Sequence, residues 1–191
     1  MQLLKDMINS YGEVCNGGVL KVGSFFNHQI DITLMSKMGE EFYNRFRNCG
    51  VTKVLTIEAS GIAFACVTAQ FFAVPMVFAK KGQSSNASDD AYTAEVVSFT
   101  RGKTYTISVP RQYLTADDTV LIVDDFLATG NALLGLIDIV RASGAKVAGV
   151  GIGIEKAFQD GGKIVRNMGV RVESLAKICS MSPEEGVTFC D

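Results

Sequence analysis

Residues 120–132 read VLIVDDFLATGNA, and this stretch decides the fold. Residues 120–123 are all apolar, which is typical of a strand buried in a parallel sheet. Two carboxylates follow at Asp124 and Asp125, then a short loop, and then an apolar periodic run from Ala132 that predicts a helix. Because ligands in open α/β sheets bind at the carboxyl ends of the strands, we expect a binding site at this turn.

The loop at residues 126–130 has the chemistry that a phosphorylated sugar requires. Gly130 permits a positive φ and a close approach of the backbone to a ligand, and Thr129 offers a hydroxyl. The free N–H groups of the loop and the first helical turn attract an anion. Asp124 and Asp125 can accept hydrogen bonds from a ribose diol or from the water shell of a divalent cation. The alternative is a plain strand–helix turn with two surface aspartates; a P-loop is excluded, because no GxxxxGK[ST] occurs.

Length and composition indicate one domain without a nucleic-acid partner. The 191 residues are 48% hydrophobic, which is ample for one core, and the net charge of −2 provides no basic surface for nucleic acid. The five cysteines include no C-x-x-C pair, and there is a single histidine, so a zinc site is disfavoured. Reduced thiols of a cytosolic protein are the better interpretation of these cysteines.

One uncharged stretch, residues 59–79, has about the length of a membrane span. Pro75 interrupts it, and we interpret it as a core helix at 62–72 followed by a buried strand at 76–79. The first 13 residues are charged and amphipathic rather than an apolar leader. We therefore expect a cytoplasmic protein that makes no membrane contact.

The remaining pattern alternates strands with helices, which implies an α/β fold with a parallel sheet covered by helices on both faces. No repeat and no linker divides the chain. The predicted helices are residues 2–10, 33–46, 62–72, 133–140 and 161–168, with Thr33 as an N-cap and Gly50 and Gly144 as stops. The predicted strands are residues 19–22, 53–57, 76–79, 120–123, 146–154 and 170–178, with a hairpin at 96–100 and 104–109 and a tail from 180.

Three further stretches carry candidate site residues, and each has a structural alternative. Ala59, Ser60 and Gly61 follow a strand and can form either an anion-binding turn or an ordinary turn in which Ser60 caps the helix. The segment GSFFNHQID at 23–31 combines aromatic and amide groups that suit a flat heterocycle, or it packs as a core lid. Lys156 is a pure donor at a strand end, suited to an oxopurine oxygen or paired with its neighbouring glutamate.

The motif of an apolar strand, two acids, two variable residues and Ala-Thr-Gly resembles the phosphoribosyl-diphosphate (PRPP) signature of the type I phosphoribosyltransferases. The rest of the chain is similar to the bacterial members of that family that use xanthine. The stretches that carry this likeness are LKVGSFFNHQID at 20–31, TIEASGIA at 56–63 and GIGIEKAFQDG at 151–161. The resemblance covers essentially the whole chain.

This resemblance implies the type I phosphoribosyltransferase fold, a parallel twisted sheet flanked by helices with a small hood. Residues 1–191 would form a single domain, with the hood contributed by about 1–32 and 155–178. The implied enzyme is a pentosyltransferase of purine salvage that forms xanthosine 5′-monophosphate (XMP) from xanthine and PRPP. Guanine or hypoxanthine as the base, or a PRPP-binding regulator of purine genes, are the alternatives. A homodimer is also implied.

The resemblance assigns residues as well. It implies that Asp124 and Asp125 are catalytic, and that Leu20, Asn27, Lys156 and Phe158 bind the purine. It implies Mg²⁺ held mainly by PRPP and water rather than by protein ligands. Four cations of the strand and hairpin beyond the third helix are candidates for the diphosphate: Lys80, Lys81, Arg101 and Lys103. The residues implied in PRPP binding are Ala59, Ser60, Gly61, Ala128, Thr129, Gly130, Asn131 and Ala132.

Two positions depart from the family pattern. Ala128 stands where hypoxanthine–guanine enzymes place an aspartate that is thought to act as a base, so no side-chain base is assigned. Asn131 and Ala132 replace the commoner Gly-Thr, which removes one hydroxyl from the loop. Asn131 can still donate to phosphate through its backbone or its side chain.

Overall fold

The computed structural model describes residues 1–82, 90–98 and 103–190, without the side chains of Ser98 and Lys103. The helices are α1 (Gln2–Tyr11), α2 (Ile32–Phe46), α3 (Gly61–Phe72), α4 (Asn131–Ala142) and α5 (Gly161–Asn167), with a π-helical turn η1 (Gly23–Asn27) and a 3-10 turn η2 (Arg111–Tyr113). The strands are β1 (Glu13–Cys15), β2 (Val19–Lys21), β3 (Lys53–Ile57), β4 (Met76–Lys81), β5 (Ala91–Ser98), β6 (Lys103–Pro110), β7 (Thr119–Leu127), β8 (Lys146–Lys156), β9 (Val172–Ser182) and β10 (Gly186–Phe189).

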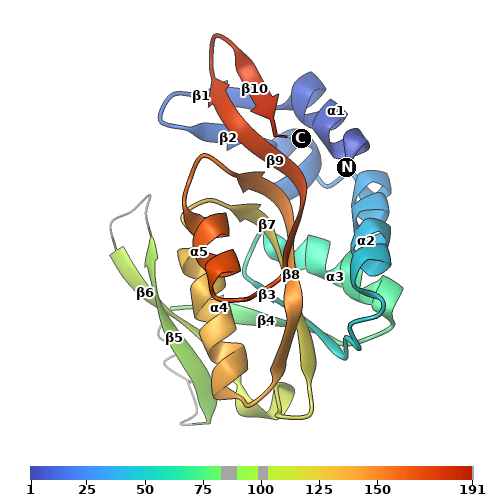
Figure 1. Cartoon of the computed structure of the whole chain (residues 1–191), viewed down its shortest axis with the longest axis vertical. Helices are drawn as coiled ribbons and strands as arrows, with labels where there is room; N and C mark the ends of the chain where they lie inside the picture. Colours follow the sequence, from blue (N-terminus) through green and yellow to red (C-terminus); the bar gives the residue numbers. More distant parts are fainter. Residues whose placement is uncertain (83–89, 99–102, 191) are drawn as a thin grey trace.

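Eight strands form one sheet in the order β10-β9-β8-β7-β3-β4-β6-β5 (Figure 1). The five central strands, from β9 to β4, run parallel, which confirms the predicted core of the fold. Antiparallel strands complete the two edges, β10 on one side and the β5–β6 hairpin on the other. The predicted hairpin is therefore present, although β5 begins earlier than expected.

The central strand β7 shows that both faces of the sheet are covered. Leu121 and Val123 pack into a core with α1, α2 and α3, whereas Val120 and Ile122 pack on the other face with α4 and the β5–β6 hairpin. All four side chains are fully buried. Burial on both faces explains the continuous apolar run from which a parallel strand was predicted.

Several predicted boundaries were wrong, and two of them bear on the site. Strand β7 does not stop at 123 but includes Asp124 and Asp125, because it pairs with the long β8 as far as Leu127 opposite Glu155. The loop before α4 is accordingly only residues 128–130. At the start of α2 the cap is not Thr33 but Asp31, whose Oδ1 accepts a hydrogen bond from the N–H of Leu34 at 3.0 Å.

The C-terminal segment is not a tail. Strand β9 extends to Ser182, and β10 folds back against it as an antiparallel hairpin. This pairing brings Cys179 and Cys190 together, with 5.2 Å between their Cα atoms, and they form a disulfide. The expectation that all five thiols are reduced was therefore wrong, because the sequence pattern did not reveal the hairpin that joins these two.

The segment between α1 and α2 forms the upper part of the molecule in Figure 1, where it lies beside β9 and β10. Strands β1 and β2 form a two-stranded antiparallel sheet around a turn in which Gly17 and Gly18 both have a positive φ. The π-helical turn η1 then buries Phe25 and Phe26 in the core of α1, α2 and α3. This packing holds η1 next to the carboxyl ends of the parallel strands.

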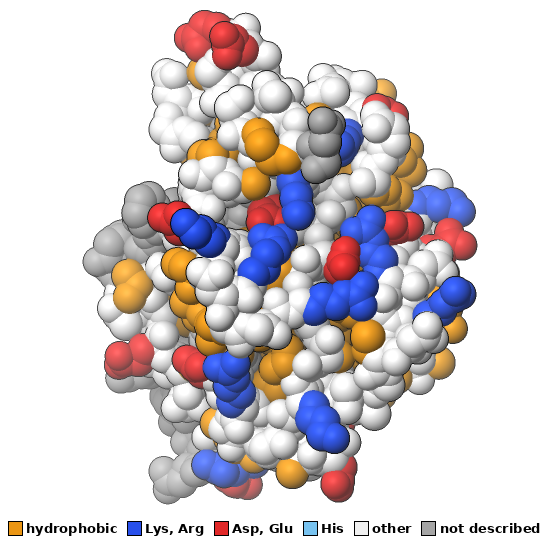
Figure 2. All heavy atoms as spheres, in the orientation of Figure 1, with side chains coloured by type: hydrophobic (Ala, Val, Ile, Leu, Met, Phe, Trp, Pro, Cys, Tyr) orange, Lys and Arg blue, Asp and Glu red, His pale blue; other side chains and the backbone are white. Residues whose placement is uncertain are grey.

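Basic and acidic side chains lie next to one another on the face shown in Figure 2, over β9 and α2, rather than gathering into patches of one sign. Several of them are paired, including Arg45 with Glu41 and Glu173, and Arg171 with Glu173. Among the described parts of the chain, no helix combines the length and the apolar character that crossing a bilayer requires.

Candidate active site

A cavity of about 280 Å³ lies at the carboxyl end of β7. The loop after β7 and the first residues of α4 form one wall, and β4, β5 and β6 contribute the opposite wall. Gly130 adopts the positive φ, 86°, that the loop motif predicted. The lining residues are Lys81, Val96, Val97, Tyr105, Asp124, Phe126, Leu127, Ala128, Thr129, Gly130, Asn131, Ala132 and Leu133.

The two aspartates of the motif are buried at this strand end, Asp124 with 7% and Asp125 with 8% of its surface exposed. Each accepts a hydrogen bond from the next backbone N–H, Asp124 Oδ1 from Asp125 and Asp125 Oδ1 from Phe126, both at 3.0 Å. Burial raises the pKa of Asp124 well above its ordinary value, the charge of Asp125 raises it further, and Lys81 opposes the shift. Among the described residues, the positive charge of Lys81 therefore does not outweigh the effects of burial and of the Asp125 charge on Asp124.

Residues 59–61, which the family resemblance implies in PRPP binding and which we call the diphosphate turn, lie next to the same aspartate. A Cβ on Gly61 would lie 2.8 Å from Asp124 Oδ1 and still closer to Thr56 Oγ1, so only glycine fits at the start of α3. Ala59 and Ser60 line a second cavity, of about 350 Å³, together with Asn27 and other residues of the η1 region. The Ser60 side chain makes no capping hydrogen bond with α3, so it does not act as the helix cap of the structural alternative.

Lys156 lies at the end of β8, next to β7. Its Nζ donates to the carbonyl of Gly18 at 2.7 Å and lies 5.8 Å from the centre of the Phe126 ring. Burial lowers the pKa of Lys156. The alternative, an ion pair with Glu155, is wrong, because Glu155 is paired with Arg166 instead.

Asn27 and Phe158, both predicted to bind the purine, line different cavities. Leu20 is buried in β2, on the strand that follows the Gly18 turn, and Asn27 lines the cavity of the diphosphate turn. Phe158 is 45% exposed and lines a third cavity, of about 490 Å³, formed with α5. Phe126, which sequence reasoning did not propose, is the aromatic ring near Lys156.

The sequence interpretation also missed Tyr105, which lines the β7 cavity from β6. Burial and the charge of Asp124 both raise the pKa of its hydroxyl. Lys81, one of the four candidate cations, lines the same cavity, and its Nζ lies 5.7 Å from the Tyr105 ring centre. Arg101 and the side chain of Lys103 lie outside the described residues, and Lys80 does not line the cavity.

Asn131 contributes to this site in an unexpected way. Its Nδ2 donates to the carbonyl of Val97 at 2.9 Å, so the side chain ties the start of α4 to β5. Within the described parts of the chain, the backbone N–H of Asn131, the first residue of α4, donates to no other strand. Of the two routes to phosphate that the sequence left open for Asn131, the backbone is the one that this geometry favours.

A sequence model of the phosphoribosyl transferase domain matches residues 29–161, which is more than half of the chain and includes β7, its loop and the diphosphate turn. The chain therefore belongs to the phosphoribosyltransferase family.

Within this family the chain is similar to proteins named xanthine phosphoribosyltransferase. It is 56% identical to the one from Ruminiclostridium cellulolyticum over 95% of both chains, and 55% identical to the one from Lachnoclostridium phytofermentans over 97% of this chain and 96% of that one. The one from Bifidobacterium longum is 52% identical over 99% of each.

Solved structures support the fold. APRTase from Giardia lamblia, complexed with 9-deazaadenine, matches with a TM-score of 0.78 at 20% identity, covering 91% of this chain and 97% of the other. Adenine phosphoribosyltransferase from Rhodothermus marinus matches with a TM-score of 0.76 at 19% identity, covering 93% and 100%. The predicted type I phosphoribosyltransferase fold is thus confirmed.

Proposed function

We propose that this protein transfers the 5-phosphoribosyl group of PRPP to N9 of xanthine, forming XMP and diphosphate in purine salvage. The observation that carries the proposal is the cavity at the end of β7, where the glycine loop, a helix N-terminus and a buried aspartate meet. The identity of 50–56% with proteins named xanthine phosphoribosyltransferase, over nearly the whole chain, supports the choice of base.

In this proposal the β7 cavity holds the ribose 5-phosphate part of PRPP. The N–H groups of residues 128–132 donate to the 5-phosphate, helped by the dipole of α4. Asp124 and Asp125 accept hydrogen bonds from the ribose hydroxyls, which places neutral donors next to two buried acids. The turn at 59–61 binds the diphosphate group, and the close approach of Gly61 to Asp124 supports this assignment.

The purine lies between the N-terminal segment and the strand ends, in reach of Lys156. Lys156 donates to an oxygen of the oxopurine, in place of the Gly18 carbonyl that it contacts here. Adenine would present an amino donor to this ammonium group and leave both unpaired, which disfavours it strongly. Leu20 and Asn27 would complete the purine site, and we propose Phe126 rather than Phe158 as its aromatic neighbour.

The chemistry needs positioning more than it needs a reactive side chain. N9 of the purine, its proton released to water, attacks the anomeric carbon while the bond from that carbon to the diphosphate oxygen breaks and the oxygen keeps the electron pair, with positive charge developing on the sugar ring. No covalent enzyme intermediate is required. In this proposal the carboxylates of Asp124 and Asp125 face the sugar ring, and in their ionised form they stabilise the charge that develops on it.

We also propose Mg²⁺ as the cofactor. The donor set fits, because Asp124 lines the cavity and Asp125 follows it in β7, and their carboxylates supply the hard oxygen acceptors that suit the water shell of this ion. Asp124 and Asp125 would hold the ion through its water molecules, with PRPP providing the remaining ligands. When bound, the ion supplies positive charge at the diphosphate leaving group.

The proposal extends to assembly and location. We propose a homodimer, as the family resemblance implies, and light scattering of the purified protein would test it. We propose a cytoplasmic location, because a substrate with several negative charges does not cross a lipid bilayer and has to be used where it is made. Cell fractionation would test that point.

The deciding experiment incubates the purified protein with Mg²⁺, PRPP and each of xanthine, guanine, hypoxanthine and adenine, and measures the nucleotide formed. XMP formed fastest would support the proposal. Faster product from guanine or hypoxanthine would keep the PRPP site and replace the base. No product with any base would favour a PRPP-binding regulator, which a gel-shift assay would then test.

A further inference from the structure

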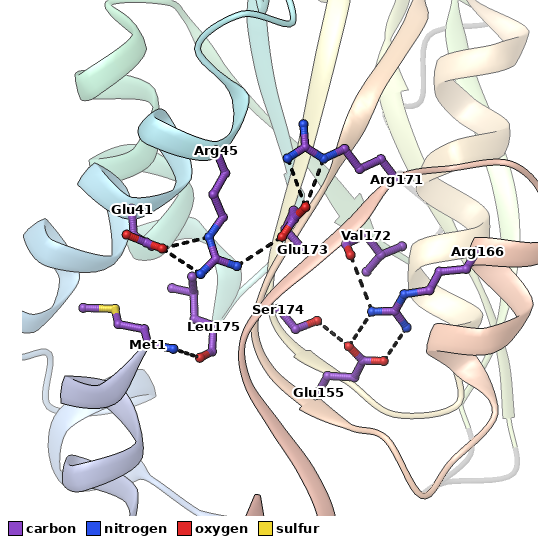
Figure 3. A network of polar contacts seen from close by, with 10 residues as sticks. All are labelled: Met1, Glu41, Arg45, Glu155, Arg166, Arg171, Val172, Glu173, Ser174 and Leu175. Carbon is purple, nitrogen blue, oxygen red and sulfur yellow. Dashed lines mark hydrogen bonds and ion pairs between the residues drawn. The ribbon is translucent and has the colours of Figure 1, made fainter. Parts of the chain in front are cut away.

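The ion pair between Glu155 and Arg166 is the best-defined polar contact near the site that the proposed reaction does not use (Figure 3). Arg166 donates from Nη1 to Glu155 Oε1 at 2.6 Å and from Nη2 to Oε2 at 2.8 Å, and Ser174 also donates to Oε2. The Glu155 side chain is 3% exposed. Burial opposes its ionisation, but the hydrogen bonds from Arg166 and Ser174 outweigh burial and lower its pKa.

A buried pair of this kind is weak evidence for stability, since apolar residues of similar volume often serve as well. What the pair does supply is fixed geometry, because a bidentate contact sets both the distance and the relative orientation of the guanidinium and the carboxylate. The partners lie on two elements joined by a turn. Glu155 precedes Lys156 at the end of β8, and Arg166 lies in α5.

The start of α5 packs against residues 128–130, the loop between β7 and α4, which we call the phosphate loop. The N–H of Gly161 donates to the carbonyl of Ala128 at 3.1 Å. A Cβ on Gly161 would lie 2.5 Å from the N of Gly130 and closer still to the Ala128 carbonyl oxygen, so the two backbones meet without an intervening side chain. The phosphate loop therefore rests on the first residue of α5.

The next residue meets the ion pair. A Cβ on Gly162 would lie 2.6 Å from Arg166 Nη1 and closer still to Glu155 Oε1. The two glycines thus form a close-packed contact between three parts of the chain. The phosphate loop packs against Gly161, and the carboxylate of Glu155 packs against Gly162. Moving α5 relative to β8 would separate the pair and shift the surface on which the phosphate loop rests.

We propose that Glu155 and Arg166 are positioning residues that lock α5 to the end of β8 and so hold the phosphate loop and Lys156 at one fixed separation. This inference rests on the function proposed above, in which the loop binds the 5-phosphate and Lys156 binds the base. The fixed separation matters for a ligand that spans both halves of the site. It matters much less for a ligand that occupies only one half.

The test follows from that difference. A nucleotide joins a base to a ribose 5-phosphate, so its affinity exceeds that of its separate parts only when both half-sites have the spacing that the nucleotide requires. The dissociation constants of xanthine, ribose 5-phosphate and XMP should be measured by calorimetry for the wild type, Glu155→Gln and Arg166→Met. Glu155→Gln keeps the shape of the side chain and removes its charge, which guards against simple misfolding.

We expect the affinity of both variants for xanthine and for ribose 5-phosphate to stay within about two-fold of the wild type. Both should bind XMP about ten-fold more weakly, which corresponds to a loss of roughly 1.4 kcal/mol in binding free energy. Arg171→Met is the matched control. It removes an arginine of the more exposed pair with Glu173 in the same network, and XMP affinity should not change.

Unchanged XMP affinity in both variants would overturn the positioning role. An equal loss for all three ligands would also overturn it, because that is the signature of general destabilisation. If the wild type binds neither xanthine nor XMP, the proposed base is wrong rather than the positioning role. The same comparison is then made with guanine or hypoxanthine and its nucleotide.

Discussion

The neighbouring strands β7 and β8 each carry two adjacent ionisable residues near the carboxyl end, and the environments of the two pairs differ. At the end of β7, Asp124 and Asp125 are both buried, and burial raises the pKa of Asp124. At the end of β8, the buried Glu155 has a lowered pKa, because Arg166 and Ser174 satisfy its carboxylate. Lys156 beside it remains partly exposed, and its Nζ donates to a backbone carbonyl of the N-terminal segment and lies near the Phe126 ring.

The difference distinguishes a charged side chain that has its hydrogen-bond partners within the protein from side chains whose charge a ligand could balance. Glu155 needs nothing further, so its role is to position other groups. A ligand that brings hydroxyl donors or a cation would stabilise the ionised acids of β7, and a ligand that brings a better acceptor would stabilise the ammonium group of Lys156. Ionisable groups with a strongly shifted pKa and no balancing charge are a feature of functional sites, whereas a paired buried charge is a feature of structural ones.

The largest effect is expected at the β7 end. Asp125→Ala should lower kcat/KM for PRPP by about 100-fold or more, since each hydrogen bond to a charged group contributes about 1.5–3 kcal/mol and a ribose diol offers two. Steady-state kinetics with PRPP varied at saturating base would measure it. Asp117→Ala is the control, because Asp117 is exposed at the opposite end of β7 and its loss should have no effect. If turnover and KM stay unchanged in Asp125→Ala, these acids do not bind the sugar.

At the β8 end the expected effect is smaller and confined to the base. Lys156→Met should raise KM for the oxopurine by about 10- to 100-fold, because one charge-assisted hydrogen bond is lost while the apolar stem is kept. KM for PRPP should change by less than about three-fold. The same substitution at the exposed Lys163 of α5 is the control. Equal increases for base and PRPP would contradict a role in base recognition and indicate a structural one.

The contrast also explains how far the sequence alone could lead. The β7 end was predictable because its strand, acids, loop and helix are consecutive, so local chemistry and local structure coincide. Gly130 could be assigned a positive φ from this pattern, and the structure confirms it. The parallel core followed from the alternation of apolar strands and amphipathic helices for the same reason.

The β8 end was less predictable because its partners come from distant parts of the chain. Nothing in the sequence near Glu155 indicates that Arg166, 11 residues later, would pair with it rather than Lys156. The orientation of Phe158 depends on where α5 packs, and Tyr105 reaches the site from a separate hairpin. The disulfide depends in the same way on the β9–β10 pairing, which a weakly patterned C-terminal segment did not reveal.

The smallest expected effect is on the free energy of unfolding. The sign of that change tests whether the charges at the two strand ends differ as described. A raised pKa means that folded Asp124 holds its proton more tightly than the unfolded chain does, so its ionised form lowers the free energy of unfolding at neutral pH. Asp124→Asn should therefore stabilise the ligand-free protein at pH 7, by about 0.5–2 kcal/mol, the usual range for single stabilising substitutions. The asparagine can still accept the hydrogen bond from the N–H of Asp125. The gain should shrink as pH falls through the folded-state pKa and vanish below about 3.9, the ordinary value of an aspartate.

Glu155→Gln should do the reverse. Its lowered pKa means that ionised Glu155 contributes stability above about 4.3, the ordinary value of a glutamate, which is lost as pH falls through the folded-state pKa. The amide variant should therefore be less stable than the wild type at pH 7, and the deficit should disappear in acid. Urea unfolding of both variants between about pH 2 and pH 8, without ligand, would measure the two signs and the loss of both effects in acid. If Asp124→Asn destabilises the protein at pH 7, the acids of β7 are satisfied within the free protein, and a ligand is not needed to balance their charge.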